Sequence, residues 1–184
     1  NTNTYDVGIT STEMVAGEKT NVTITVKPKK TGVYSPMIEI PIAGFTFDNE
    51  TGITENNELG AFEYLNGTTG NDHPSLFIQS VEWNRSELQT YQFKITPEDH
   101  GALDLDLRIR PLYDDTNVYL TNETFTVMGR GNVSVNVVGE DGAPVKAESI
   151  TFDTTVIENK SSYAFTGILE GTYTLVVNGT GGHP

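Results

Sequence analysis

The chain has no cysteine, few basic residues and no long apolar run. Its 184 residues include 11 lysines and arginines against 25 aspartates and glutamates, for a formal net charge of −14. Nucleic-acid binding requires clustered basic side chains that neutralise phosphates, so this charge argues against a nucleic-acid partner. A bilayer span needs roughly 18 to 20 consecutive apolar residues. No stretch of the sequence approaches that length, and we expect no membrane insertion in this chain.

The sequon Asn-x-Ser/Thr is the strongest signal in the sequence, because it marks a site of N-linked glycosylation. It occurs at eight of the fifteen asparagines, whereas chance would place roughly three. Asparagine, serine and threonine also gather in turns and at strand edges, which would inflate the count. We interpret the excess as a glycosylated extracellular surface. The predicted sites are Asn21, Asn49, Asn66, Asn84, Asn122, Asn132, Asn159 and Asn178.

The missing cysteines refine the predicted location. Small secreted domains of animals and plants are usually held together by disulfides, and this chain can form none. A prokaryotic cell surface therefore fits better. Among prokaryotes, dense sequons combined with surface acidity indicate an archaeal envelope or extracellular appendage.

Apolar and polar residues alternate along most of the chain, which is the two-residue period of a half-buried β-strand. The clearest case is Leu103–Arg110, where four aliphatic side chains alternate with four charged ones. No segment keeps a helical period. We expect seven to nine strands in residues 1–128, folded as an antiparallel β-sandwich. Further candidate strands are Asp6–Thr10, Val22–Val26, Met37–Ile42, Leu76–Trp83, Tyr91–Ile95 and Thr124–Met128.

A domain boundary is predicted at Gly129-Arg130-Gly131, because two glycines there separate two alternating stretches. Residues 129–184 then form a second, small β-sandwich in which Val133, Val135 and Val137 alternate with polar residues. The predicted fold class is all-β, with two consecutive antiparallel β-sandwich domains, immunoglobulin-like, at residues 1–128 and 129–184.

Two stretches of the second domain carry recognisable motifs: Gly131–Val145 contains an Asp-Gly-x-Pro-Val turn, and Ser162–Val177 ends in Gly-Ile-x-x-Gly-x-Tyr-x-Leu-x-Val. With these motifs the domain resembles carboxypeptidase-regulatory-like β-sandwich modules. The resemblance implies a non-catalytic structural module of a prokaryotic surface protein, with Tyr173 plugging the core. Some collagen-adhesin relatives carry a Lys–Asn isopeptide bond, which we do not expect here because the first strand has no lysine.

The first domain is similar to immunoglobulin-like modules of archaeal and bacterial surface proteins. The similarity lies in Val15–Glu18 leading into Asn21–Val26, and in Phe93–Pro97 leading to the turn at Gly101. It implies a fold class and assigns no ligand.

No pattern in the sequence indicates catalysis. The three histidines, His73, His100 and His183, have no metal-ligand spacing, and motifs for nucleophiles, phosphates and metalloproteases are absent. Two of the 25 acids could in principle form a glycosidase pair, but solvated surface acids are the preferred interpretation. We therefore expect a non-enzyme with no catalytic residue, cofactor or catalytic metal. A structural calcium ion stays an alternative at the oxygen-rich loops Asp48–Glu50, Asp114–Asn117 and Glu140–Asp141.

Each of three further features of the sequence has two possible interpretations. The strand that contains Tyr5, Val7 and Ile9 pairs within its own sheet, or it completes a neighbouring subunit by donor-strand addition. The charged face from Asp104 to Arg110 is solvated, or it docks a neighbouring subunit. Trp83 packs in the core, or it stacks on a sugar.

These observations predict a non-enzymatic, glycosylated extracellular structural protein. It would be a subunit of a surface filament or surface layer that self-associates through β-strand or domain contacts. Two alternatives are an adhesive or carbohydrate-binding module of a larger surface protein and an accessory domain of a secreted hydrolase.

Overall fold

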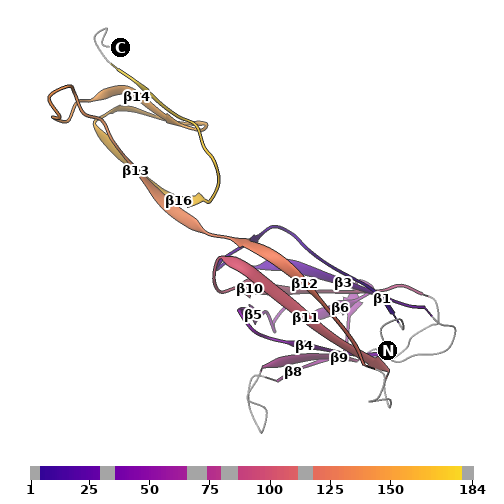
Figure 1. The fold of residues 1–184 in the computed structure, drawn as a ribbon. Coiled ribbons are helices and arrows are strands. Elements are labelled where there is room, and N and C mark those ends of the chain that lie inside the picture. Colours follow the sequence, from indigo (N-terminus) through magenta and orange to yellow (C-terminus); the bar gives the residue numbers. More distant parts are fainter. Residues whose placement is uncertain (1–4, 30–35, 66–73, 80–86, 112–117, 180–184) are drawn as a thin grey trace. The chain divides into compact units, whose positions relative to one another are not determined.

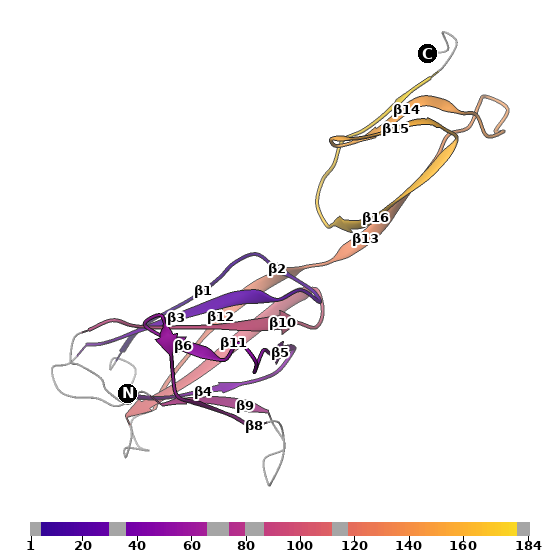
Figure 2. The same cartoon turned by 180° about the vertical axis from the view of Figure 1, so that it is seen from behind.

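The computed structural model describes residues 5–29, 36–65, 74–79, 87–111 and 118–179. These residues form β-strands and turns without a helix, so none of the described segments offers a helical membrane span. The chain separates into two compact units, residues 1–128 and 129–184 (Figures 1 and 2).

The first sheet of the first unit has the strand order β1-β3-β10-β6-β7, and β5 also pairs with β10. All of its pairs are antiparallel. Along β3, Val22, Ile24 and Val26 are fully buried, while the threonines between them lie on the other face. The strands are β1 (Tyr5–Ser11), β3 (Thr20–Pro28), β5 (Phe45–Phe47), β6 (Ile53–Glu55), β7 (Glu58–Leu59) and β10 (Gln89–Pro97).

The second sheet has the order β2-β12-β11-β4-β9-β8. Among the described strands, only β2 and β12 form a parallel pair; the other neighbours are antiparallel. Leu103, Leu105, Leu107 and Ile109 of β11 are buried and the residues between them face outward, which confirms the predicted alternation. The strands are β2 (Met14–Val15), β4 (Pro36–Pro41), β8 (Phe62–Leu65), β9 (Ser75–Gln79), β11 (Gly101–Pro111) and β12 (Tyr119–Met128).

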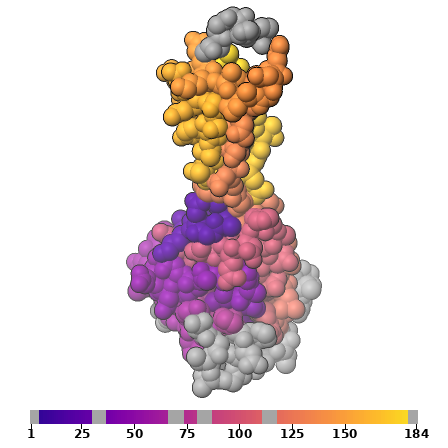
Figure 3. All heavy atoms as spheres, turned by 90° about the vertical axis from the view of Figure 1, so that its left-hand side faces the viewer, coloured from indigo at the N-terminus to yellow at the C-terminus, as the bar shows by residue number. Residues whose placement is uncertain are grey.

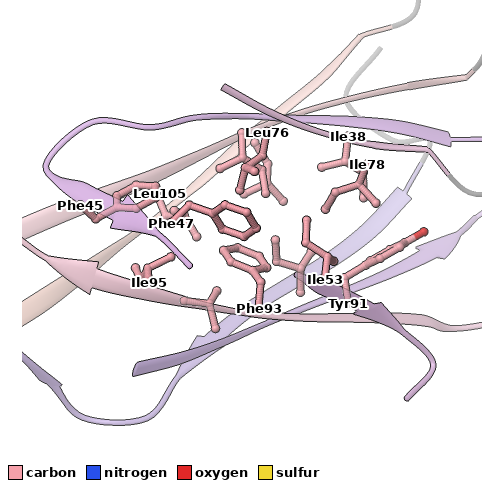
Figure 4. Packing of buried hydrophobic residues seen from close by; sticks show 14 of the residues in the cluster. Ile38, Phe45, Phe47, Ile53, Leu76, Ile78, Tyr91, Phe93, Ile95 and Leu105 are labelled. Carbon is pink, nitrogen blue, oxygen red and sulfur yellow. The ribbon is translucent and has the colours of Figure 1, made fainter. Parts of the chain in front are cut away.

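The core of the first unit lies between the inner faces of these two sheets (Figure 4). Phe47 occupies its centre and meets Phe62 and Tyr64 edge-on, with ring centroids 5.7 and 5.4 Å away. Those two rings belong to β8 of the opposite sheet, and within its own sheet Phe47 packs against Phe93 of β10 at 6.2 Å. Apolar faces that meet in this way define a β-sandwich, and the predicted fold class is confirmed.

The second unit has a two-stranded sheet, β13-β16, and a three-stranded sheet, β15-β14-β17. Its core consists of Val135, Ala147, Ile150, Phe152 and Phe165. The strands are β13 (Arg130–Asn136), β14 (Ala147–Phe152), β15 (Thr155–Lys160), β16 (Ser162–Leu169) and β17 (Leu175–Asn178).

The turn expected at Asp141-Gly142 forms as the residue types require. Gly142 has φ +81°, and Asp141 Oδ1 accepts a hydrogen bond from the backbone N–H of Ala143 at 3.0 Å. In the same unit, the expected burial of Tyr173 was wrong. Tyr173 does not plug the core but is 36% exposed. Its ring packs against Phe152 with centroids 5.0 Å apart, and its hydroxyl donates to the carbonyl of Leu169.

The strand count was also underestimated, since the described part of the first unit contains twelve strands. Strands such as β2 and β7 are two residues long, too short to show a period in the sequence. The strand predicted at Leu76–Trp83 corresponds to β9, which is described over Ser75–Gln79. Trp83 lies outside the described residues.

Replacing Phe93 by alanine should strongly destabilise the first unit. The side chain is 1% exposed and contacts Phe47, so its loss leaves a cavity and should cost about 3 to 5 kcal/mol of unfolding free energy. Equilibrium urea unfolding followed by circular dichroism measures the change. Leu59→Ala is the control, because Leu59 is 78% exposed and its truncation should change stability by less than about 0.5 kcal/mol. Equal effects of the two substitutions would contradict this core.

Candidate glycosylation and assembly surfaces

Three predicted glycosylation sites lie on the described surface of the first unit. Asn21 is on β3, Asn49 is in the turn that follows β5, and Asn122 is on β12; all three are exposed. Asn66 and Asn84 lie outside the described residues.

The second unit carries the other three sites, again on exposed residues. Asn132 of β13 accepts a hydrogen bond from the N–H of Gly167 at 3.3 Å. Asn178 of β17 donates to Ser149 Oγ at 3.1 Å, and Asn159 of β15 has φ +62°. The exposure of all six described asparagines is compatible with glycans, but asparagine is usually exposed in any case. Glycosylation therefore stays a prediction.

The turn around Asn49 is organised by the carboxylate of Asp48. Its Oδ2 accepts a hydrogen bond from Thr51 Oγ1 at 2.5 Å and lies 3.2 Å from Lys19 Nζ. The Thr51 hydrogen bond, assisted by Lys19, holds the pKa of Asp48 below its ordinary value because both favour the ionised form. Thr51 is also the hydroxyl residue of the Asn49 sequon, so one side chain belongs to both features.

The oxygen-rich loops that suggested calcium make other contacts where they are described. The carboxylate of Asp48 faces Lys19, and that of Asp141 caps its own turn. No group of three or more acidic or histidine side chains comes together within the described ranges. His100 is exposed in the bend before β11. The loop Asp114–Asn117, His73 and His183 lie outside the described residues, and calcium binding stays untested.

The outer face of the second sheet bears the charged residues of β11. Thr124 Oγ1 donates to Asp104 Oδ1 at 2.5 Å across the β11–β12 pair, and Arg108 lies 3.8 Å from Glu39 of β4. Asp104 and Arg108 thus each have one partner on a neighbouring strand. Among the described residues the buried polar ones are Thr20, Ser75 and Gln89, none of which is an acid.

An open groove of about 570 Å³ crosses this outer face. Leu120 lies in it with 67% of its surface exposed, beside the sequon residue Asn122. Sequence patterns did not reveal this groove, because it depends on the register that places Asn122 opposite Asp106. Six of the residues that line it are Pro41, Asp106, Arg108, Val118, Leu120 and Asn122.

The candidate assembly strand is β1, and in this chain it pairs within its own sheet. Val7 pairs with Val26 and Ile9 with Ile24, while the buried Tyr5 meets Tyr119 edge-on at 6.4 Å between ring centroids. The strand is the last in its sheet, so one of its edges has no strand neighbour among the described residues. Figure 3 shows the N-terminal part of the chain, indigo, at the surface of the first unit.

A second edge strand, β17, is less protected than β1. Leu175 pairs with Phe152 and Val177 with Ile150, so both side chains lie on the face of the sheet that carries the core. They are nevertheless 47% and 41% exposed. Charged residues normally guard such an edge, as Glu158 does on the opposite edge strand β15. The run from Tyr173 to Gly179 has no charged residue.

No protein-family model matches the chain, and no curated protein matches it. Among solved structures it is similar to a cohesin module from a family 33 glycoside hydrolase of Clostridium perfringens, with TM-score 0.47 and 14% identity over 70% of this chain and 99% of that one. It is also similar to BcpA, the major pilin subunit of Bacillus cereus, with TM-score 0.49 and 8% identity over 94% of this chain and 59% of that one. A third similar structure is the bacterial hydrophobin BslA, with TM-score 0.44 and 12% identity over 68% of this chain and 98% of that one.

The Asp48 turn should make stability depend on pH. A folded-state pKa below the ordinary value of about 3.9 contributes stability above that pH, and the contribution is lost as the pH falls through the folded-state pKa. Thr51→Val, made in unglycosylated recombinant protein, should lower the thermal midpoint at pH 6, and the difference from wild type should shrink toward pH 3. Thr51→Ser keeps the hydroxyl and should behave as wild type. A difference that is constant from pH 6 to pH 3 would refute this role.

Proposed function

We propose that the chain is a non-enzymatic, glycosylated structural protein of an archaeal cell surface, and a subunit of a filament or surface layer. Support for the glycosylated surface comes from the eight sequons and from the exposure of the six described ones. The observation that carries the assembly is the uncharged edge of β17, whose apolar side chains are half exposed on the core-facing side of their sheet.

The occupant of this edge is a strand from a second copy of the chain. Two copies that each carry a net charge of −14 repel one another, so close contact is favoured where the surface is uncharged. The edge from Tyr173 to Gly179 meets that condition. An added strand would satisfy the outward backbone groups of β17 and would cover Leu175 and Val177. The same burial would enlarge a small core, in which the described residues contribute five buried side chains.

The identity of the added strand determines the form of the assembly. If β17 pairs with β17 of a second copy, the contact is isologous and closes as a dimer. If β17 pairs with a different edge strand, the contact is heterologous and can repeat without closing. Because β1 is an edge strand with a single charged residue, Asp6, it is the partner we assign. This pairing uses the outer edge of β1 and leaves Tyr5 in its own core.

Val177→Lys should abolish assembly while the chain stays folded. A lysine on the edge strand brings a charge that the paired strand would have to desolvate. Sedimentation velocity and negative-stain electron microscopy over a concentration series measure the assembly, and circular dichroism reports the fold. Val156→Lys is the matched control, because Val156 is 54% exposed on the opposite edge strand β15. A wild-type protein that remains monomeric, or a Val177→Lys variant that assembles equally well, would refute the proposal.

The predicted glycans are tested separately from assembly. Glycopeptide mass spectrometry of protein isolated from its native source should find modified asparagine at the exposed sequons. Asn21, Asn122 and Asn178 are three such sites, on three different strands. Unmodified asparagine at all eight sequons would refute the glycosylated surface.

A carbohydrate-binding module is the second candidate function, and the groove beside Leu120 is the observation that favours it. Its volume lies within the roughly 300 to 1,000 Å³ of small-molecule sites. Binding of free oligosaccharides by unglycosylated protein on an array, and loss of that binding in Asp106→Ala, would support this alternative.

A further inference from the structure

The groove on the outer face of the second sheet contains a predicted attachment site for a sugar. Asn122 lines the groove and pairs across the strands with Asp106, which lines it too. Of the six sequon asparagines that the structure describes, Asn122 alone belongs to this groove. A glycan attached to its side-chain nitrogen therefore begins at the groove wall. This reasoning rests on the proposed glycosylation and extends it.

The groove offers the two kinds of contact that a sugar can use. Leu120, 67% exposed, and the half-buried Pro41 provide apolar surface for the C–H face of a sugar ring. Asp106 provides carboxylate oxygens that accept hydrogen bonds from hydroxyl groups, and Arg108 provides N–H donors for sugar oxygens. The guanidinium is only partly engaged by its ion pair with Glu39, since the two groups are 3.8 Å apart and its side chain is 54% exposed.

Covalent attachment explains why the occupant is the chain's own glycan. The groove is open and contains one large exposed apolar side chain, so a free sugar would bind it weakly. A tethered ligand reaches an effective concentration in the millimolar range or above when its link is short, and binding becomes intramolecular. The asparagine linkage to Asn122 is such a link, because it starts within the groove.

We propose that the N-glycan on Asn122 folds back into this groove, where its first sugars pack on Leu120 and Pro41 and hydrogen-bond to Asp106 and Arg108. The glycan then belongs to the surface of the first unit instead of projecting into solvent. It covers Leu120, the one leucine of β12, and shields this part of the sheet from contact with other molecules.

The test is the rate at which a glycosidase trims each site of the folded native glycoprotein, followed by glycopeptide mass spectrometry. The enzyme is one that trims all modified sites equally in the denatured protein. A glycan that is docked for about nine-tenths of the time is cleaved about tenfold more slowly. We expect that protection at Asn122 and not at Asn21, which lies on the other sheet. Equal cleavage of Asn122 and Asn21 in the folded protein would overturn the proposal.

Leu120→Ser, expressed in the native host, should raise the cleavage rate at Asn122 to that of Asn21. The matched control is Leu59→Ser, an exposed leucine on β7 of the first sheet, which should leave the protection at Asn122 unchanged. Protection that survives Leu120→Ser would overturn the docking. So would an unmodified Asn122 in a protein whose other sequons carry glycans, although the glycosylated surface would then stand. If no sequon is modified, both the glycosylated surface and the docking fail.

Discussion

The packing of Phe47 against aromatic rings of both sheets is the contact on which the first unit depends. Phe47 meets Phe62 and Tyr64 of β8 and also Phe93 of β10, so one side chain joins the two layers of the sandwich. A chain without cysteine has no covalent link between its sheets, and apolar burial must hold them together. Since inward positions are reserved for this core, alternate positions face solvent. The sequons on β3 and β12 use those outward positions.

The excess of acidic over basic residues is the second constraint, because it determines how copies of the protein can approach one another. Ion pairs on the described surface join Lys19 to Asp48, Lys29 to Asp6 and Arg108 to Glu39. With 25 acidic residues against 11 basic ones, negative charge dominates the protein, and copies of it repel one another at low salt. An uncharged edge strand is unusual on such a surface. The exposed Leu175, Val176 and Val177 stand out for that reason, and they connect the electrostatics to the proposed assembly.

Prediction from sequence succeeded where one local rule decides the structure. The alternation of Leu103–Arg110 correctly predicted which side chains are buried, because a strand has only two faces. The turn at Gly142 followed from the need for a positive φ. Prediction from sequence failed where the burial of a side chain depends on contacts with another strand. The ring of Tyr173 stays partly exposed while it packs against Phe152 of another strand, β14, and the sequence around Tyr173 does not show that contact.

The sequence by itself determined the class of the protein. Its two-residue period leads to β-sheets, its acidity argues against nucleic acid, and its sequons predict a glycosylated surface. Only the tertiary structure decided which exposed residues share a surface. The register of β11 against β12 brings Asp106 beside Asn122, and the order of the last sheet leaves β17 at an edge. Strand pairing joins residues far apart in sequence, and a local pattern does not encode the choice of partner.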